Sequence, residues 1–332
     1  MVYYTLEYNK MKALILFSGG LDSILAAKLL LEQGIKVYAV NFTSPFYQDS
    51  HAAEKAAKAL KIPLKTITLG TDFLNIIKKP RYGYGANINP CIDCRILMLK
   101  KAKKYAEKIN AEFIATGEVL GERPMTQLKP SLELIEEKAG LKGKLLRPLS
   151  AKLLPETEAE KKGYVNRGKL LAIQGRSRKL QLALAKKYSI RYFPTPAGGC
   201  LLTQKEFAAK LRDLFKHQNK ISMKDIPVLK IGRHFRYHEN KIIVGRNQQE
   251  NQKLLELKKP SDYIFEVPVI GSPITLLQGP KTKPAIKKAA QLTARYSDAE
   301  EKTVKVSYGK ENFNKSIRIS YPEDIEIQKM RI

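Results

Sequence analysis

The sequence predicts an α/β protein in which a doubly wound parallel sheet is followed by a second, smaller α+β domain. Strand-length apolar segments alternate with helix-length segments from residue 11 to about 117. A glycine turn at 18–23 joins the first strand to the first helix, and the chain becomes β-rich near residue 226. We therefore expect a first domain at 1–204, a connection at 205–225 and a second domain at 226–332.

The pattern of apolar residues predicts the order of elements. In the first domain these are a strand at 13–17, a helix at 21–33, a strand at 36–42, a helix at 50–61, a strand at 64–68, helices at 71–79 and 93–109 and a strand at 112–116. Repeated strand–helix units of this length imply right-handed crossovers and a parallel sheet covered on both faces. In the second domain we expect a helix at 248–258, strands near 262–267 and 273–277, a helix at 283–296 and a strand near 303–308.

Charge is the strongest signal in the composition. Sixty Lys and Arg residues against 32 Asp and Glu residues leave a formal charge of +28, spread along the chain. This balance favours a polyanionic partner, most simply nucleic acid. A lysine-rich, heat-adapted surface is the alternative, but such surfaces usually carry matching glutamate. No apolar segment approaches the roughly 20 residues of a membrane span, and no signal peptide is evident, so we expect a cytoplasmic protein with no membrane partner.

The stretch "ILFSGGLDS" combines a strand, a glycine turn and the start of a helix. Backbone N–H groups of Gly19 and Gly20, with the hydroxyls of Ser18 and Ser23, predict a phosphate or pyrophosphate site at a helix N-terminus. The stretch lacks the lysine of a Walker A loop and the third glycine of a dinucleotide fingerprint. A glycine turn without a ligand is the alternative.

The residues "SGGLDS" match the S-G-G-x-D-S signature, so the chain resembles the PP-loop ATP pyrophosphatases, which have an adenine nucleotide alpha hydrolase-like fold. Members of that superfamily adenylate a carbonyl or carboxylate and release pyrophosphate. The resemblance implies that ATP phosphates are bound by Ser18, Gly19, Gly20, Asp22 and Ser23. It also implies a catalytic role for Asp22 in holding Mg²⁺. Further nucleotide contacts are implied at the ends of two other strands, at Asn41, Phe42, Thr116 and Gly117.

Three cysteines, an odd number, do not suggest a disulfide framework in a reducing compartment. Cys91 and Cys94 form a C-x-x-C at the start of a predicted helix, where thiol pKa values are lowered, and Cys200 lies in the loop "FPTPAGGCLLT". One interpretation is that all three cysteines are buried and have only a structural role. A zinc site would need a fourth ligand, which no nearby C-x-x-C or H-x-H supplies, and His217, His234 and His238 belong to the later region. An iron–sulfur cluster on three thiolates, or a catalytic pair with a persulfide, fits better.

PP-loop proteins with this cysteine arrangement resemble the 2-thiouridine and 4-thiouridine synthases of tRNA. The resemblance implies that Cys91, Cys94 and Cys200 ligate a [4Fe–4S] cluster, with Cys94 and Cys200 as the catalytic cysteines. Without a cluster, Cys94 and Cys200 become persulfide carrier and resolving thiol. The sulfur donor would be free sulfide or a persulfide carrier such as a cysteine desulfurase.

The segment "HFRYHENKIIVGRNQQENQKLLELKKPSDYIFEVPVIGSPITLL" resembles the small RNA-binding domain of the NFACT proteins. This resemblance implies phosphate contacts at Arg233, Arg236, Lys241 and Arg246, with Tyr237 and Asn247 at bases or sugars. An ordinary solvated basic face is the alternative. Further cations would extend the path towards the active site, at Lys161, Lys162, Arg167, Arg176 and Arg178.

Together these features predict an ATP-dependent tRNA sulfurtransferase that adenylates a uridine carbonyl and replaces its oxygen with sulfur. The sequence is also compatible with a homodimer. Two other classes remain open: a PP-loop enzyme that acts on a small molecule, and a non-catalytic RNA-binding or ribosome-binding protein.

Overall fold

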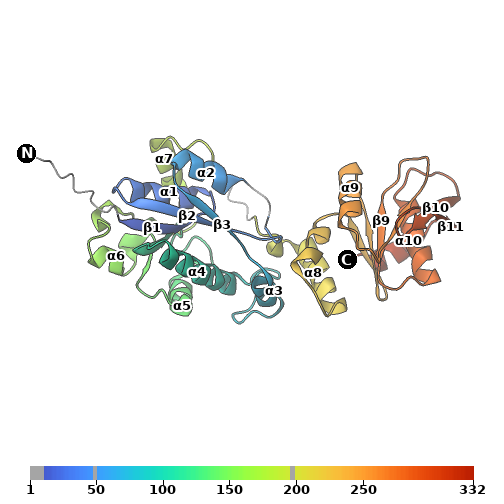
Figure 1. Ribbon diagram of the computed structural model, residues 1–332, viewed down its shortest axis with the longest axis horizontal. Coiled ribbons are helices and arrows are strands. Elements are labelled where there is room, and N and C mark those ends of the chain that lie inside the picture. The colour runs from blue at the N-terminus through green and yellow to red at the C-terminus, as the bar shows by residue number, and fades with distance from the viewer. Residues whose placement is uncertain (1–10, 48–50, 195–198) are drawn as a thin grey trace, which may run out of the picture. The chain divides into compact units, whose positions relative to one another are not determined.

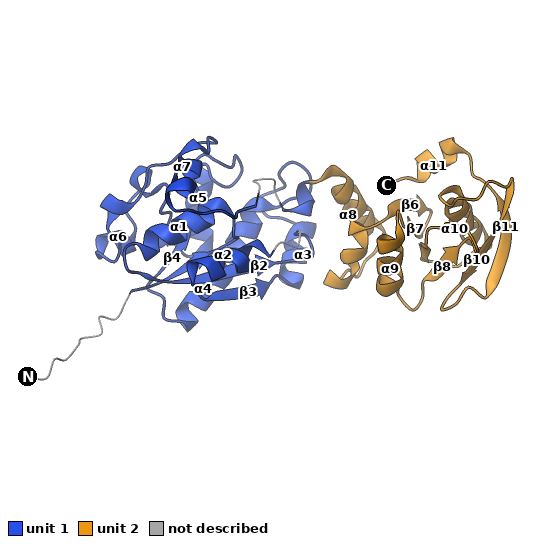
Figure 2. Cartoon of the chain, turned by 90° about the horizontal axis from the view of Figure 1, so that it is seen from above, with its two compact units in different colours: residues 1–203 blue, residues 204–332 orange. Residues whose placement is uncertain are grey.

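The computed structural model describes residues 11–47, 51–194 and 199–332. The chain divides into two compact units, Met1–Thr203 and Gln204–Ile332 (Figure 2). No helix among the described residues is long and apolar enough to cross a membrane.

A five-stranded parallel sheet forms the centre of the first unit, with strand order β3-β2-β1-β4-β5. Its strands are β1 (Lys12–Leu16), β2 (Lys36–Thr43), β3 (Leu64–Thr68), β4 (Phe113–Thr116) and β5 (Leu145–Leu146). Its helices are α1 (Leu21–Leu31), α2 (Ala52–Leu60), α3 (Thr71–Lys78), α4 (Cys91–Lys108), α5 (Lys129–Ala139), α6 (Glu158–Lys161) and α7 (Lys179–Lys187). The strand order reverses between β1 and β4, which is the topological switch point where such sheets bind ligands.

Strand β1 shows why this sheet is covered on both faces. Ala13 and Ile15 belong to an apolar core with α1, α2 and α7, whereas Leu14 and Leu16 belong to a second core with α4 and α5. Figure 1 shows these two groups of helices on opposite sides of the sheet. A strand that is buried on both faces has a continuous apolar sequence, as β1 does. The predicted doubly wound parallel sheet is therefore confirmed.

The second unit contains a six-stranded antiparallel sheet with strand order β11-β10-β8-β9-β7-β6. Its strands are β6 (Arg233–Tyr237), β7 (Asn240–Val244), β8 (Tyr263–Glu266), β9 (Thr275–Gln278), β10 (Thr303–Gly309) and β11 (Lys315–Ser320). Its helices are α8 (Lys205–His217), α9 (Gln248–Leu257), α10 (Lys283–Arg295) and α11 (Asp324–Met330). Helix α10 packs on the sheet through a stripe of alanines, Ala285, Ala289 and Ala290, so the predicted α+β class is confirmed for this part.

Several elements differ from the sequence expectation. Helix α8 occupies most of the expected connection at 205–225, because its apolar face, Phe207, Leu211 and Leu214, is buried. The stretch "EVLGERPMTQLKPS" at 118–131 predicts a loop, but helix α5 already begins at Lys129. Strand β11 and helix α11 have no counterpart in the prediction, since only short apolar patterns mark them. Residue 50, the first of the helix expected at 50–61, lies outside the described residues.

Candidate functional site

The turn after β1 requires glycine at position 19. Gly19 has φ +74°, and a Cβ there would lie 2.3 Å from the backbone carbon of Ala52 at the start of α2. Only glycine combines this left-handed conformation with so close a backbone approach. Gly20 is extended and precedes the first turn of α1, so free N–H groups of that turn point out of the helix.

Two hydroxyls line the same turn. The Ser23 Oγ donates to the Gly20 carbonyl at 2.8 Å, and the Ser18 Oγ accepts from the Gly20 N–H at 3.3 Å. Ser18 Oγ and Ser23 Oγ lie 3.4 Å apart. The sequence-predicted residues of the turn therefore form one small polar surface at the positive end of α1, which suits an anion.

The end of β4 closes on this turn. A Cβ on Gly117 would lie 2.5 Å from the Ser23 nitrogen and 2.6 Å from the Asp22 carbonyl carbon, so the two backbones touch. Thr116 is buried, and its Oγ1 donates to Glu118 Oε2 at 3.1 Å. Thr116 and Gly117 thus define the second side of the switch-point crevice.

Asn41 and Phe42 lie at the carboxyl end of β2, on the same edge of the sheet as the glycine turn. They pair in register with Thr66 and Ile67 of β3, and both are half-buried. Both residues therefore lie at the edge of the sheet where the resemblance implies further nucleotide contacts.

Asp22 carries a buried carboxylate oxygen, Oδ1, with no hydrogen-bond partner among the described residues. Burial raises the pKa of Asp22, and the positive charge of Arg178 partly opposes this. Arg178 Nε and both polar atoms of the Gln181 side chain are also buried without partners in this part of the chain. Buried polar groups need hydrogen-bond or charge partners. The unpartnered arginine suits an anionic ligand, and the unpartnered carboxylate oxygen suits a cation that is coordinated by oxygen.

Four residues that lie near Asp22 were not predicted to belong to the nucleotide site. Arg178 was assigned to an RNA path, but its charge acts on Asp22, and the predicted nucleotide site did not include Glu122, Arg123 or Gln181. Burial raises the pKa of Glu122, and the charge of Asp22 raises it further. Their positions depend on long loops folding back over β1 and β4, and no periodic pattern in the sequence marks such a return.

Tyr47 lies beside two of the three cysteines, Cys94 and Cys200. The Tyr47 hydroxyl is hydrogen-bonded to Cys94 Sγ at 3.3 Å, and Tyr47 forms an isolated antiparallel bridge with Cys200. Cys91 Sγ accepts from Asn89 Nδ2 at 3.1 Å. Residues more than a hundred positions apart are thereby brought to one place, and all three thiols are free and half-buried.

The expectation of lowered thiol pKa values at a helix N-terminus is wrong for Cys94. Burial raises the pKa of Cys94 to about 12 and that of Cys200 to about 11. Desolvation of the Cys94 thiolate outweighs both the helix dipole and the opposing positive charge of Arg95. The charges of Cys91 and Cys200 each raise the pKa of Cys94 further, so the three thiols lie within reach of one another's charge.

The described residues contain no group of three or more His, Cys, Asp or Glu side chains arranged to hold a single metal ion. The thiols are therefore not a preformed mononuclear site. A cluster held by the three thiols stays a prediction.

Two arginines connect the crevice with the thiols. Arg95 follows Cys94, and its Nε lies 3.0 Å from Oε1 of Glu118, a carboxylate that is 2% exposed. Burial alone would raise the pKa of Glu118, but Arg95 and Arg147 hold it below its ordinary value. Burial is the largest influence on the pKa values of Asp22 and Cys200 and raises both of them. The positive charge of Arg123 acts in the opposite direction on both pKa values. The charge of Arg123 therefore acts both on the glycine turn and on a thiol.

The cations predicted to contact RNA in the second unit are engaged within the protein. Asp213 accepts from Arg236 at 2.9 and 2.6 Å and lies 3.3 Å from Lys241 Nζ. Lys241 is only 4% exposed, which is at odds with a phosphate contact. Arg246 pairs with Glu250, and the guanidinium of Arg233 lies 4.6 Å from the centre of the Tyr296 ring. Asn247 caps α9 by accepting from the Glu250 N–H at 3.0 Å.

The switch-point crevice and its lysine-free glycine turn define a nucleotide-binding α/β domain of the PP-loop class. Residues 8–152 match the family model "Thiamine biosynthesis protein (ThiI)", and residues 232–331 match "NFACT protein RNA binding domain". The chain thus combines a ThiI-type PP-loop domain with an NFACT-type RNA-binding domain.

The curated relatives match about a third of this chain. A tRNA-specific 2-thiouridylase MnmA from Sulfurimonas denitrificans is 39% identical over 115 residues, which are 32% of this chain and 34% of the relative. A protein of the same name from Syntrophotalea carbinolica is 36% identical over 124 residues, which are 33% of this chain and 35% of that relative. The chain therefore spans about a third of the length of these relatives. A solved 4-thiouridine synthetase in complex with RNA and bound ATP has 23% identity and a TM-score of 0.39, covering 66% of this chain and 52% of that one.

Proposed function

We propose that this protein is an ATP-dependent tRNA sulfurtransferase that adenylates a uridine carbonyl and replaces its oxygen with sulfur, forming 4-thiouridine or 2-thiouridine. The observation that carries the proposal is the meeting of an anion-binding glycine turn and three free thiols at one edge of the sheet, with Arg123 acting on both. The ThiI-type model and the thiouridylase relatives support it.

In the activating half of the site, the uridine oxygen attacks the α-phosphorus of ATP, and pyrophosphate leaves. The N–H groups of the glycine turn and the hydroxyls of Ser18 and Ser23 would hold the phosphates and stabilise the developing charge. The unpartnered Oδ1 of Asp22 suits Mg²⁺, which prefers carboxylate oxygen, and a bound cation would keep Asp22 ionised. Arg178 would neutralise phosphate charge from the opposite side.

In the sulfur half, Cys91, Cys94 and Cys200 would hold a [4Fe–4S] cluster, whose open iron would supply sulfide. The new C–S bond forms at the activated carbon, the C–O bond breaks, and AMP leaves with the uridine oxygen. Thiols must lose their protons to bind iron, and Arg95 and Arg123 favour the thiolate forms of Cys94 and Cys200 respectively.

A persulfide route uses the same residues without a cluster. The terminal sulfur of a Cys94 persulfide forms the C–S bond, and the Cys200 thiolate attacks the inner sulfur as the S–S bond of the persulfide breaks. The product is a Cys94–Cys200 disulfide, which an external dithiol must reduce. In either route we expect a cytoplasmic enzyme that takes sulfur from free sulfide or from a persulfide carrier such as a cysteine desulfurase.

Deleting the gene should remove one thionucleoside from bulk tRNA. The measurement is mass analysis of nucleosides from digested tRNA, comparing the deletion strain with the same strain carrying the gene on a plasmid. Restoration by the plasmid would also identify the modified base. Unchanged amounts of all thionucleosides would contradict the proposal and favour a small-molecule substrate or a non-catalytic role.

If a cluster is present, anaerobically purified protein should be brown, with absorbance at about 400 nm that is typical of iron–sulfur centres. Cys91→Ala should lose this absorbance and the bound iron, because only three thiols are available as ligands. A matched control is Asn89→Ala, which removes the hydrogen bond to Cys91 Sγ but leaves all three thiols in place. Iron-free protein that still thiolates tRNA would exclude the cluster and leave the persulfide route.

A further inference from the structure

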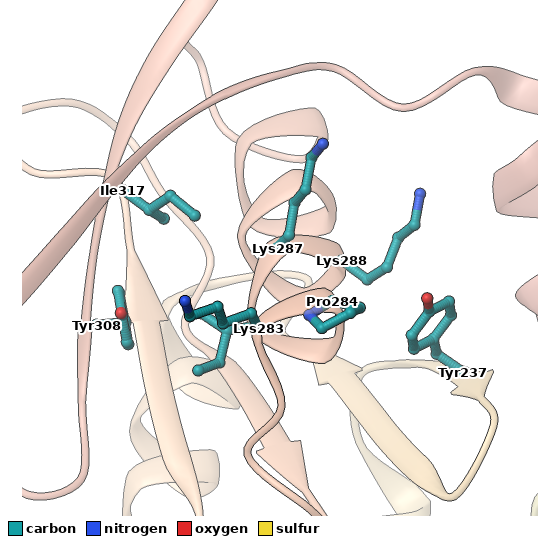
Figure 3. Close-up of a pocket in the computed structure, with 8 residues that line it drawn as sticks. Tyr237, Lys283, Pro284, Lys287, Lys288, Tyr308 and Ile317 are labelled. Carbon is teal, nitrogen blue, oxygen red and sulfur yellow. The ribbon is translucent and has the colours of Figure 1, made fainter.

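The second unit contains a cavity of about 580 Å³ whose lining includes none of the four cations predicted from the sequence. Figure 3 shows the first turns of α10 between two tyrosine side chains, Tyr237 at the end of β6 and Tyr308 on β10. Lys283, Lys287 and Lys288 project from the same turns of the helix. The volume falls in the usual range for small-molecule sites.

The lysines of this cavity differ from the cations described above. Lys283 and Lys287 are exposed, and no carboxylate among the described residues forms an ion pair with either of them. Lys288 is paired with Glu326, which leaves two lysines whose charge is not neutralised. Helix α10 begins beside them, with Thr282 capping the Ala285 N–H at 3.3 Å, so its positive end adds to the attraction for an anion.

The tyrosines give the cavity a second kind of binding surface. The Tyr308 ring stacks on Phe265 at 5.2 Å between centroids and 12° between planes, which fixes its orientation. The Tyr237 ring packs edge to face against His238 at 4.6 Å. Both side chains are half-buried, and both contribute to the cavity wall. Aromatic rings held in place beside free cations are the arrangement that binds unstacked bases and their phosphates.

We propose that this cavity binds one nucleotide of a single-stranded RNA segment, with Lys283 and Lys287 at phosphates and the base on a tyrosine ring. The inference rests on the proposed function insofar as tRNA supplies that segment. An acidic peptide would use the lysines but would gain little from the two rings, so the aromatic walls favour RNA. The site thereby replaces Arg236, Lys241 and Arg246, which already form ion pairs with Asp213 and Glu250.

The test uses the full chain and a fluorescein-labelled oligouridine, with binding followed by anisotropy over a range of salt concentrations. Lys283→Gln combined with Lys287→Gln should weaken binding about tenfold and lower the slope of log affinity against log salt by about 1.4, at roughly 0.7 per phosphate. The matched control combines Lys224→Gln with Lys253→Gln, which removes two exposed lysines of the same unit that do not line the cavity. Ultraviolet crosslinking of the wild-type complex should label Tyr237 or Tyr308.

Equal losses in the two double variants, or crosslinks only at other residues, would overturn the assignment of the cavity. So would unchanged oligouridine binding together with weaker binding of an acidic peptide, which would assign the cavity to a protein partner. Thermal unfolding of each variant checks that the unit is still folded. Oligouridine binding does not depend on the thiolation reaction. If the cavity binds RNA but the protein does not thiolate tRNA, the proposed function is refuted and this inference stands.

Discussion

Replacing Cys94 by serine is expected to lower tRNA thiolation by about 10³-fold or more, because the residue is a cluster ligand in one proposed route and carries the sulfur in the other. ATP binding should remain, since Cys94 lies on α4 and the phosphate turn joins β1 to α1. The measurement pairs single-turnover thiolation of unmodified tRNA with ATP binding on the same preparation. Loss of both activities together would show misfolding rather than loss of the thiol.

Cys91→Ser serves as the internal comparison for this prediction. In the cluster route all three thiols are ligands, so Cys91→Ser and Cys94→Ser should be equally inactive. In the persulfide route Cys91 carries no sulfur, so its variant should retain most of the activity. Full thiolation by Cys94→Ser would contradict both routes and the assignment of the thiols to the reaction.

Gly19→Ala should greatly weaken ATP binding, even though alanine keeps the backbone N–H. The new Cβ would lie 2.3 Å from the Ala52 carbon and 2.4 Å from the Ala53 nitrogen, so the turn and the start of α2 must separate. We expect a loss of stability of about 1–2 kcal/mol from the left-handed conformation, and about 1–3 kcal/mol more from the overlap. Displaced N–H groups should reduce ATP affinity at least about tenfold, which corresponds to about 1.4 kcal/mol.

Gly34→Ala is the matched control for that variant. Gly34 has φ +76°, close to that of Gly19, but a Cβ there would meet nothing within 4 Å. It should therefore show only the conformational loss of about 1–2 kcal/mol, with unchanged ATP affinity. The measurement is thermal unfolding and ATP titration on both variants. Equal ATP affinities for the two would mean that the close approach to α2 does not shape the phosphate site.

The first unit was predictable where local pattern decides structure. Apolar runs such as "ALILF" and the periodic positions of α1 are typical of a buried strand and a helix, whatever surrounds them. The turn between them needs glycine because of backbone sterics, which act within a few residues. The short elements at the chain's end, β11 and α11, were missed because six or seven residues carry too little pattern.

The sequence by itself determined the doubly wound sheet, the position of the anion-binding turn and the identity of the three thiols. Only the tertiary structure decided which groups surround Asp22, how strongly burial raises the pKa of Cys94, and which cations of the second unit are neutralised. Backbone geometry and hydrophobic periodicity depend on near neighbours in the chain. Desolvation and ion pairing depend on distances in space, so Asp213 can neutralise Lys241, and Tyr47 can join Cys94 to Cys200, only once packing has brought them together.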